Sequence, residues 1–130
     1  GRGRRCRVNE APVLDASALL AFLQGEAGAP QVQGLLDAGA TCSAANWSEV
    51  AQKVRSKGKD WDMSRALLMS YDLKVEPVTV DDAEWAAARW RIGESLSLAD
   101  RLCLALAARM GVDAWTADTA WTDVRVNQIR

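Results

Sequence analysis

The order of hydrophobic and polar residues along the chain predicts strands that alternate with helices. Short apolar runs bounded by turn residues predict strands over residues 12–14, 40–43, 74–78, 113–116 and 124–129. Apolar residues three or four positions apart, with capping residues at their ends, predict helices over residues 16–23, 32–39, 46–58, 60–71, 81–92 and 98–110. Pro77 should place the third strand near a sheet edge. This alternation predicts a three-layer α/β domain with a mainly parallel central sheet flanked by helices.

Length and composition fit one soluble globular domain. The chain has 130 residues, of which 49% are hydrophobic and 25% charged, and no apolar run approaches the roughly 18 residues that a membrane span needs. The arginines near the start are not followed by the apolar segment of a signal peptide. The three cysteines are odd in number and far apart, so we expect buried thiols in a reducing, cytoplasmic compartment.

We expect residues 12–130 to form the domain and residues 1–11 to form a basic arm. Subtracting the four arginines of this arm from the net charge of −1 leaves −5 for all other residues, Glu10 of the arm included. That charge is not typical of a surface that coats nucleic acid. The arm is consistent with an RNA contact, an extended start or a cloning remnant.

The chain contains no histidine, and this absence excludes several kinds of catalysis. Ser-His and Cys-His nucleophiles, imidazole acid–base chemistry and histidine-containing zinc sites are all ruled out. Three separated cysteines cannot form a four-cysteine site either. Carboxylates must therefore carry most of the chemistry of any enzyme built from this sequence, and their oxygen atoms suit Mg²⁺ or Mn²⁺.

Four acids lie at or shortly after predicted strand ends or in the first turns of predicted helices: Asp15, Glu49, Asp100 and Asp118. In a parallel sheet with neighbouring strands these side chains converge at one edge. Two carboxylates about 4 Å apart repel each other by roughly 4 kcal/mol at an effective dielectric constant near 20. A divalent cation turns that repulsion into a binding site and activates water for phosphodiester hydrolysis.

Each acid also has a purely structural interpretation. Asn46 with Glu49, and Ser97 with Asp100, have the spacing of helix capping boxes. Asp81 with Glu84 repeats the spacing where no catalytic role is expected, so such boxes also occur here for structural reasons. Asp15 and Asp118 are equally consistent with turn residues.

Four segments occur in the order PVLDASALLAFL, SAANWSEV, LSLADRLCLALAARMG and AWTADTAW. In their order and spacing they resemble the signature blocks of PIN-domain proteins, especially the VapC-type toxins of bacterial toxin–antitoxin pairs. The resemblance runs from about Val13 to Trp121. The chain departs from the family at its start, where Pro12 shortens the first strand.

The resemblance implies a metal-dependent endoribonuclease that cuts structured RNA, forms a homodimer and is silenced by a VapB-type antitoxin. It implies that Asp15, Glu49, Asp100 and Asp118 are the catalytic, metal-coordinating acids, with Mg²⁺ or Mn²⁺ as the cofactor. It also implies supporting polar roles for Ser17, Asn46 and Thr116, which are equally consistent with turns or caps. Asp123 is a further nearby acid that we expect to be solvated.

Two other features have both a structural and a functional interpretation. Lys53, Arg55, Lys57 and Lys59 cluster near a helix C-terminus, where cations are favourable, and they are also candidate RNA-phosphate contacts. Trp121 is a candidate for stacking on an RNA base, although core packing is the favoured interpretation.

Other classes of protein fit the sequence less well. A response-regulator receiver normally has paired acids after its first strand, whereas Asp15 stands alone. A haloacid-dehalogenase-type phosphatase needs Asp-x-Asp, and Ser17 occupies the position of the second acid. The alternative that remains is a catalytically inactive PIN-like module that binds RNA or a protein partner.

Overall fold

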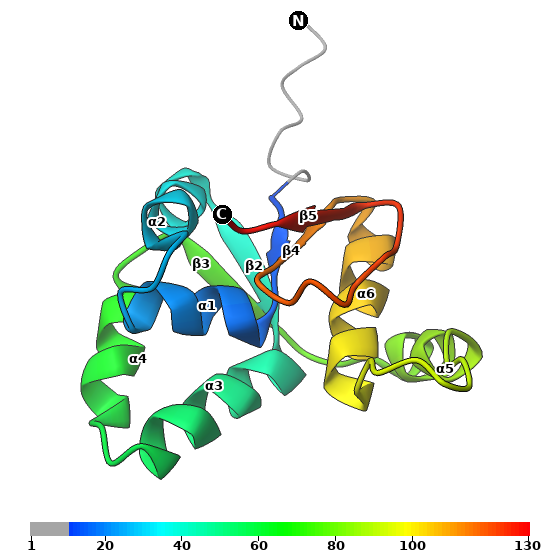
Figure 1. Ribbon diagram of the computed structural model, residues 1–130, viewed down its shortest axis with the longest axis horizontal. Helices are drawn as coiled ribbons and strands as arrows, with labels where there is room; N and C mark the ends of the chain where they lie inside the picture. The colour runs from blue at the N-terminus through cyan, green and yellow to red at the C-terminus, as the bar shows by residue number, and fades with distance from the viewer. Residues whose placement is uncertain (1–10) are drawn as a thin grey trace, which may run out of the picture.

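The computed structural model describes residues 11–130 as a five-stranded parallel sheet with six helices (Figure 1). The strands are β1 (Val13–Leu14), β2 (Ala40–Ser43), β3 (Leu73–Glu76), β4 (Ala114–Thr116) and β5 (Val126–Gln128). The helices are α1 (Ala16–Leu23), α2 (Ala29–Ala38), α3 (Ala44–Ser56), α4 (Trp61–Met69), α5 (Val80–Ala88) and α6 (Leu98–Met110). The predicted α/β fold with a parallel sheet is confirmed, and the basic arm lies almost wholly outside the described residues.

The strand order β3-β2-β1-β4-β5 creates a switch point at β1. The chain first builds the sheet outward from β1 through β2 to β3, and then returns to add β4 and β5 on the other side of β1. In open parallel sheets such a reversal leaves a crevice at the carboxyl ends of the strands, where ligands bind. The neighbouring β1 and β4 therefore mark the expected position of a functional site.

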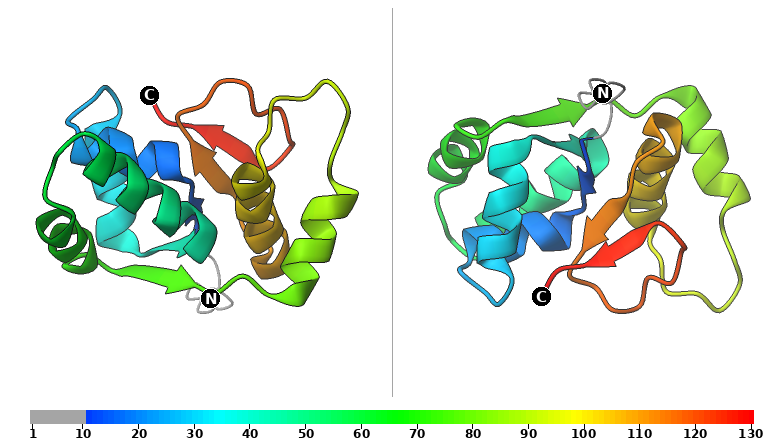
Figure 2. Two further views of the ribbon diagram at one scale, coloured as in Figure 1. Left: turned by 90° about the horizontal axis from the view of Figure 1, so that it is seen from below. Right: turned by 90° about the horizontal axis from the view of Figure 1, so that it is seen from above.

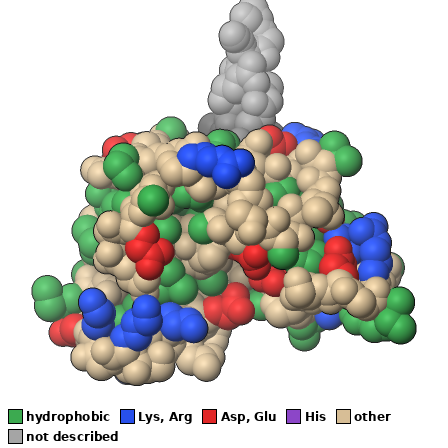
Figure 3. All heavy atoms as spheres, viewed as in Figure 1, with side chains coloured by type: hydrophobic (Ala, Val, Ile, Leu, Met, Phe, Trp, Pro, Cys, Tyr) green, Lys and Arg blue, Asp and Glu red, His purple; other side chains and the backbone are tan. Residues whose placement is uncertain are grey.

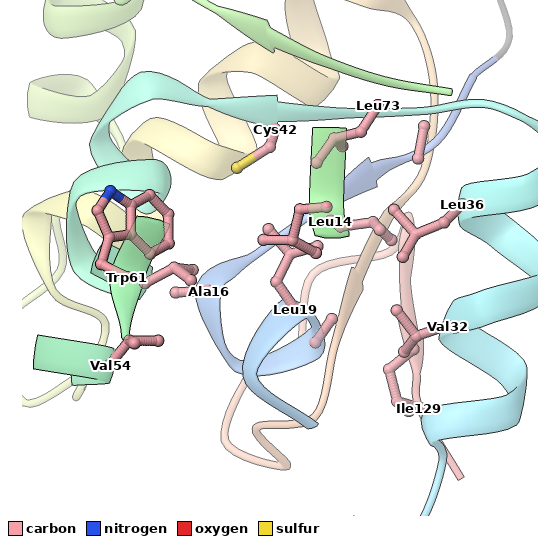
Figure 4. Packing of buried hydrophobic residues seen from close by; sticks show 14 residues of the cluster. Leu14, Ala16, Leu19, Val32, Leu36, Cys42, Val54, Trp61, Leu73 and Ile129 are labelled. Atoms are coloured by element: carbon pink, nitrogen blue, oxygen red, sulfur yellow. The ribbon is translucent and has the colours of Figure 1, made fainter. Parts of the chain in front are cut away.

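Two apolar cores cover the two faces of the sheet. Leu14 lies in a core built with α1 to α4, whereas the adjacent Val13 lies in a core built with α6, because successive residues of a strand point to opposite faces. Figure 2 accordingly shows α1 to α4 on one side of the sheet and α5 and α6 on the other. Figure 4 shows the first core, which includes Ile129 from the far end of the described chain.

Helix starts differ from the sequence prediction at two capping boxes. The Ser43 hydroxyl accepts the Ala45 N–H, so α3 begins at Ala44 and not at Asn46. Thr79, not Asp81, caps α5 and forms a reciprocal box with Asp82. In both cases a hydroxyl residue two or three positions upstream is the better cap, because its side chain reaches free N–H groups in the first turn.

The other predicted boundaries need smaller changes. The edge position of β3 is confirmed, although Pro77 follows the strand and does not interrupt it. Helix α5 ends at Ala88 and not near Ile92, and β5 is limited to three residues. Cys42 and Cys103 are buried free thiols, as expected. Within residues 11–130, no helix combines the length and apolar character needed to cross a membrane.

Candidate functional site

The centre of the site is Asp15, which follows β1 and caps α1. Its side chain is only 2% exposed, and its Oδ1 accepts the Ala18 N–H at 2.8 Å. The Ser17 hydroxyl donates to both carboxylate oxygens, at 2.8 and 2.9 Å. The Thr116 hydroxyl, at the end of the neighbouring β4, donates to Oδ2 at 2.5 Å. The carboxylate is therefore held at the switch point by residues from both strand ends.

The same two hydroxyl groups hold the loop that follows β4. Ser17 Oγ accepts the Ala117 N–H, and Thr116 Oγ1 accepts the Asp118 N–H, both at 2.9 Å. Residues 15–17 and 116–118 thus form one hydrogen-bonded unit although about a hundred residues separate them in sequence. This unit fixes the backbone of Asp118 next to the Asp15 carboxylate.

Burial makes the Asp15 carboxylate difficult to ionise. Desolvation raises its pKa from 3.8 to about 6, and the negative charge of Asp100 adds to the rise. The hydrogen bonds from Thr116, Ala18 and Ser17 oppose the shift but do not cancel it. Among the described residues, no positively charged side chain compensates the ionised Asp15 carboxylate.

Asp100 approaches the same edge from the first turn of α6. Its side chain accepts the Ser97 N–H at 2.9 Å, while Ser97 Oγ accepts the Asp100 N–H, which confirms the predicted capping box. Partial burial raises the pKa of Asp100, and the charge of Asp118 contributes, whereas the hydrogen bonds with Ser97 and, to a smaller extent, the charge of Arg101 oppose the rise. Asp100 therefore lies within electrostatic range of both Asp15 and Asp118.

Asn46 links Glu49 to this group from α3. The Asn46 side chain is fully buried, and its Nδ2 donates to Glu49 Oε1 at 2.9 Å and to the Ala99 carbonyl at 3.4 Å. The predicted Asn46–Glu49 capping box is therefore wrong, since both residues lie within α3 and interact through their side chains. The Ala99 contact connects Glu49 to the residue that precedes Asp100. The Asn46 Oδ1 atom is buried without a hydrogen-bond partner.

The first turns of α1, α3 and α6 lie near one another at the carboxyl edge of the sheet (Figure 1). The four predicted acids belong to this region: Asp15 caps α1, Glu49 follows the first turn of α3, Asp100 lies in the first turn of α6 and Asp118 follows β4. Among residues 11–130, however, no three His, Cys, Asp or Glu side chains have a geometry that holds a metal ion. Local donors occupy the carboxylates instead: Ala18 N–H for Asp15, Asn46 for Glu49, Ser97 N–H for Asp100 and Ala120 N–H for Asp118.

The residues present nevertheless fit a hard divalent cation. The donor atoms are all oxygens, which Mg²⁺ and Mn²⁺ prefer, and Asp15 is a buried carboxylate that lacks a nearby positive charge. The unpartnered Asn46 Oδ1 is a further buried oxygen beside the acids. Ser17, Thr116 and Asn46 orient the acids, as metal sites require of their surroundings.

Other residues named from the sequence lie outside this group of acids. Trp121 is 4% exposed and belongs to the core beneath α6, so the core-packing interpretation is confirmed. Asp123 is not solvated as expected, because it pairs with Arg89. A surface hollow of about 340 Å³ lies beside α5, α6 and the residues before β5, and none of the four acids lines it.

The predicted cations lie in and just beyond the last turn of α3 and are exposed. Lys and Arg side chains form a row over α3 that ends beside an acidic side chain near the centre of the view (Figure 3). Lys53, Arg55, Lys57 and Lys59 are all exposed. Lys57 also reaches the C-terminus of α1. With the Gln24 amide oriented so that its nitrogen donates to Glu26, the Gln24 side-chain oxygen accepts a hydrogen bond from Lys57 Nζ at 3.0 Å.

Sequence reasoning missed Arg101, the residue directly after Asp100. Its guanidinium donates to the Ala86 carbonyl at 2.6 Å, and its charge opposes the rise in the pKa of Asp100. The adjacency of a cation and a candidate ligand was a signal in the sequence. Nothing in the sequence indicated that the Arg101 side chain points toward α5, because that direction depends on how α5 packs against α6.

Comparison with known proteins identifies the fold and the family. A toxin–antitoxin complex from Klebsiella pneumoniae has a similar structure, with a TM-score of 0.73, 20% sequence identity and coverage of 89% of this chain and 95% of that chain. VapC20 of Mycobacterium tuberculosis, described as a sarcin–ricin-loop-cleaving toxin, matches with a TM-score of 0.65, 21% identity and coverage of 82% and 89%. No curated protein sequence matches the chain significantly.

The PIN-domain family matches residues 13–127, which run from the start of β1 into β5 and include all six helices. That range includes the switch point and all four acids. The chain therefore belongs to the PIN-domain family.

Proposed function

We propose that this protein is a divalent-metal-dependent endoribonuclease and the toxin of a VapBC-type toxin–antitoxin pair. The observation that carries the proposal is the buried Asp15 carboxylate at the β1–β4 switch point, with Asp100 within electrostatic range of it and Asp118 within range of Asp100. Without a cation the carboxylates of such a group repel one another, whereas a bound divalent cation offsets the repulsion and can activate water. Membership of the PIN-domain family and the fold shared with toxin structures support the same function.

In this proposal Asp15, Glu49, Asp100 and Asp118 hold Mg²⁺ or Mn²⁺ directly or through water. A bound divalent ion supplies an activated water and stabilises negative charge on the phosphoryl oxygens. Ser17 and Thr116 keep the Asp15 carboxylate facing the edge of the sheet, and Asn46 keeps Glu49 close to the first turn of α6. The cations of α3 extend the site along an RNA backbone.

The partners belong to the same proposal. One similar structure is a toxin–antitoxin complex, and an antitoxin with a basic segment fits an acidic site. We further propose a homodimer that acts in the cytoplasm.

The first prediction concerns cleavage itself. Purified protein, freed of any partner, should cut RNA with Mg²⁺ or Mn²⁺ and stop cutting in excess EDTA, because the carboxylates need the ion to activate water. Asp15→Asn and Asp100→Asn should abolish cutting and leave the circular dichroism spectrum unchanged. Asp62→Asn, which changes an exposed acid in the first turn of α4, is the matched control and should keep full activity.

Persistent cutting in EDTA would contradict the mechanism. The catalytically inactive alternative predicts a different pair of results, namely RNA or partner binding without cleavage under any metal. A thermal shift with Mn²⁺ separates a site that binds metal from one that does not, since a ligand that binds only the folded state stabilises it.

A further inference from the structure

Arg89 joins two loops through one buried guanidinium. Its side chain is 6% exposed and lies at the C-terminus of α5. It donates to both carboxylate oxygens of Glu94, at 2.7 and 2.9 Å. It also donates to both oxygens of Asp123, through Nε at 3.0 Å and Nη2 at 2.5 Å. One guanidinium therefore makes a bidentate pair with each of two acids, the geometry in which arginine binds most strongly.

The two acids belong to the loops that lead to the candidate site. Glu94 lies in residues 89–97, which connect α5 to α6 and end at Ser97, the cap that forms the box with Asp100. Asp123 lies in residues 117–125, the loop that carries Asp118 between β4 and β5. Arg89 thus connects the loop before Asp100 to the loop that contains Asp118.

The arrangement depends on the charge of Arg89. Hydrogen bonds from Arg89 lower the pKa of Glu94, while the charge of Asp123 acts in the opposite direction. Glu94 and Asp123 are therefore close enough to repel each other. Without Arg89 this repulsion would favour separation of the two loops.

The chain contains a comparable pair that lacks this connection. Arg109, in the last turn of α6, binds both oxygens of the buried Asp82 at 2.9 and 3.1 Å. Asp82 lies in the first turn of α5. This pair also joins α5 to α6, but at the end of α6 opposite Asp100. It serves as a control for the purely structural effect of removing an arginine between these helices.

We propose that Arg89 is a positioning residue that fixes the separation of Asp100 and Asp118, and thereby sets the affinity of the candidate site for a divalent cation. The claim that Arg89 sets the affinity for a divalent cation rests on the proposed function. The joining of the two loops stands on the contacts of Arg89 alone. Arg89 touches no residue of the acid group and acts only through Glu94 and Asp123.

The test compares Arg89→Gln with Arg109→Gln by direct Mn²⁺ titration of the folded proteins. We expect Arg89→Gln to weaken Mn²⁺ binding roughly tenfold, the usual order for residues that orient metal ligands. Arg109→Gln should lower the melting temperature but leave Mn²⁺ affinity unchanged. Arg89→Lys offers a milder variant, because an ammonium keeps the charge but cannot bind two carboxylates bidentately, and it should weaken binding to an intermediate degree.

A rescue variant isolates the electrostatic cause. In the Arg89→Gln background, changing Glu94→Gln and Asp123→Asn removes the repulsion and should restore most of the lost Mn²⁺ affinity. Wild-type affinity in Arg89→Gln, or equal weakening in Arg109→Gln, would overturn the proposal.

Hydrogen exchange without metal separates this inference from the proposed function. Arg89→Gln should speed amide exchange in both residues 90–97 and 117–125, whereas Arg109→Gln should not. Unchanged exchange in both loops overturns the joining role. If the wild-type protein binds no Mn²⁺, the proposed function and the effect of Arg89 on cation affinity are both contradicted. Amide hydrogen exchange then still tests whether Arg89 joins the two loops.

Discussion

At the scale of single residues, Asp15 is the most unusual group in the described chain. It is a carboxylate with 2% exposure whose hydrogen bonds come from one backbone amide and two hydroxyl groups, and not from a cation. Burial without a counter-charge normally costs stability and is retained where function requires it. Asp15 therefore links the stability of the metal-free protein to pH.

The second prediction concerns this linkage. The pKa of Asp15 is about 6 when folded and near its ordinary 3.8 when unfolded, so the folded state holds the proton more tightly. Metal-free protein should lose stability as pH rises from about 4 through about 6, by about 3 kcal/mol from this group. Asp15→Asn should remove that loss and be more stable than the wild type at pH 8. Urea unfolding at several pH values, in EDTA, measures the difference.

A wild type and Asp15→Asn with parallel stability profiles between pH 4 and 8 would contradict this prediction. Added Mn²⁺ should narrow the gap at pH 8, because only the wild-type carboxylate gains a counter-charge.

The residues of the site differ in how far the sequence reveals them. Asp15 and Asp118 were predictable because each acid follows a short apolar run. The role of Thr116 as a donor to Asp15 depends on the pairing of β1 with β4, which brings together residues 101 positions apart. The Arg89 contacts with Glu94 and Asp123 were not predictable, since loop conformation decides which acids meet a given arginine.

At the scale of elements, two helices begin with the same reciprocal capping box. Ser97 with Asp100 starts α6, and Thr79 with Asp82 starts α5. Both boxes satisfy free N–H groups at a helix start. They differ in location, because only the α6 box contains an acid of the candidate site.

The third prediction uses this pair of boxes. Ser97→Ala and Thr79→Ala should each lower the free energy of unfolding by about 1 kcal/mol, the usual cost of a lost cap. Only Ser97→Ala should change Mn²⁺ affinity, because it removes the hydroxyl that accepts the Asp100 N–H and so loosens the turn that positions Asp100. Denaturant unfolding and Mn²⁺ titration of both variants provide the measurements. Equal effects on metal binding would show that Asp100 acts as a cap alone.

Helix boundaries show why the prediction of elements was only partly correct. Asp81 and Glu84 have the spacing of a capping box, but Thr79 and Asp82 have it as well, and the sequence alone does not rank them. The choice depends on the exit of β3, which leaves Val80 exposed at the first turn. The parallel order of the sheet was predictable from the alternation of elements, whereas the position of the switch point was not.

At the scale of the whole molecule, charge is distributed unevenly. On one face a row of Lys and Arg side chains over α3 ends beside an acidic side chain (Figure 3). Lys53 lies four residues after Glu49 and so shares its side of the helix, whereas Arg55 lies six residues after it and points elsewhere. The two cations should therefore differ in their contact with RNA.

The fourth prediction tests that difference. Lys53→Gln should raise KM for RNA and reduce the dependence of log KM on log salt by about 0.7 to 1, the effect of losing one phosphate contact. Arg55→Gln carries the same change of charge on the same helix and should have a clearly smaller effect. Cleavage assays over a range of KCl concentrations at fixed Mg²⁺ measure both. Equal salt slopes for the two variants would show that the cations act only through overall charge.

The packing of Ile129 has a consequence for how the protein is made. Ile129 completes a core whose other buried members all lie between Leu14 and Leu73, and it fits against Gly28, where a Cβ would lie 2.2 Å from the Ile129 side chain. Ribosomes synthesise that core nearly sixty residues before the side chain that seals it. That core therefore stays unsealed until β5 and the residue that follows it have been synthesised, long after its other buried members.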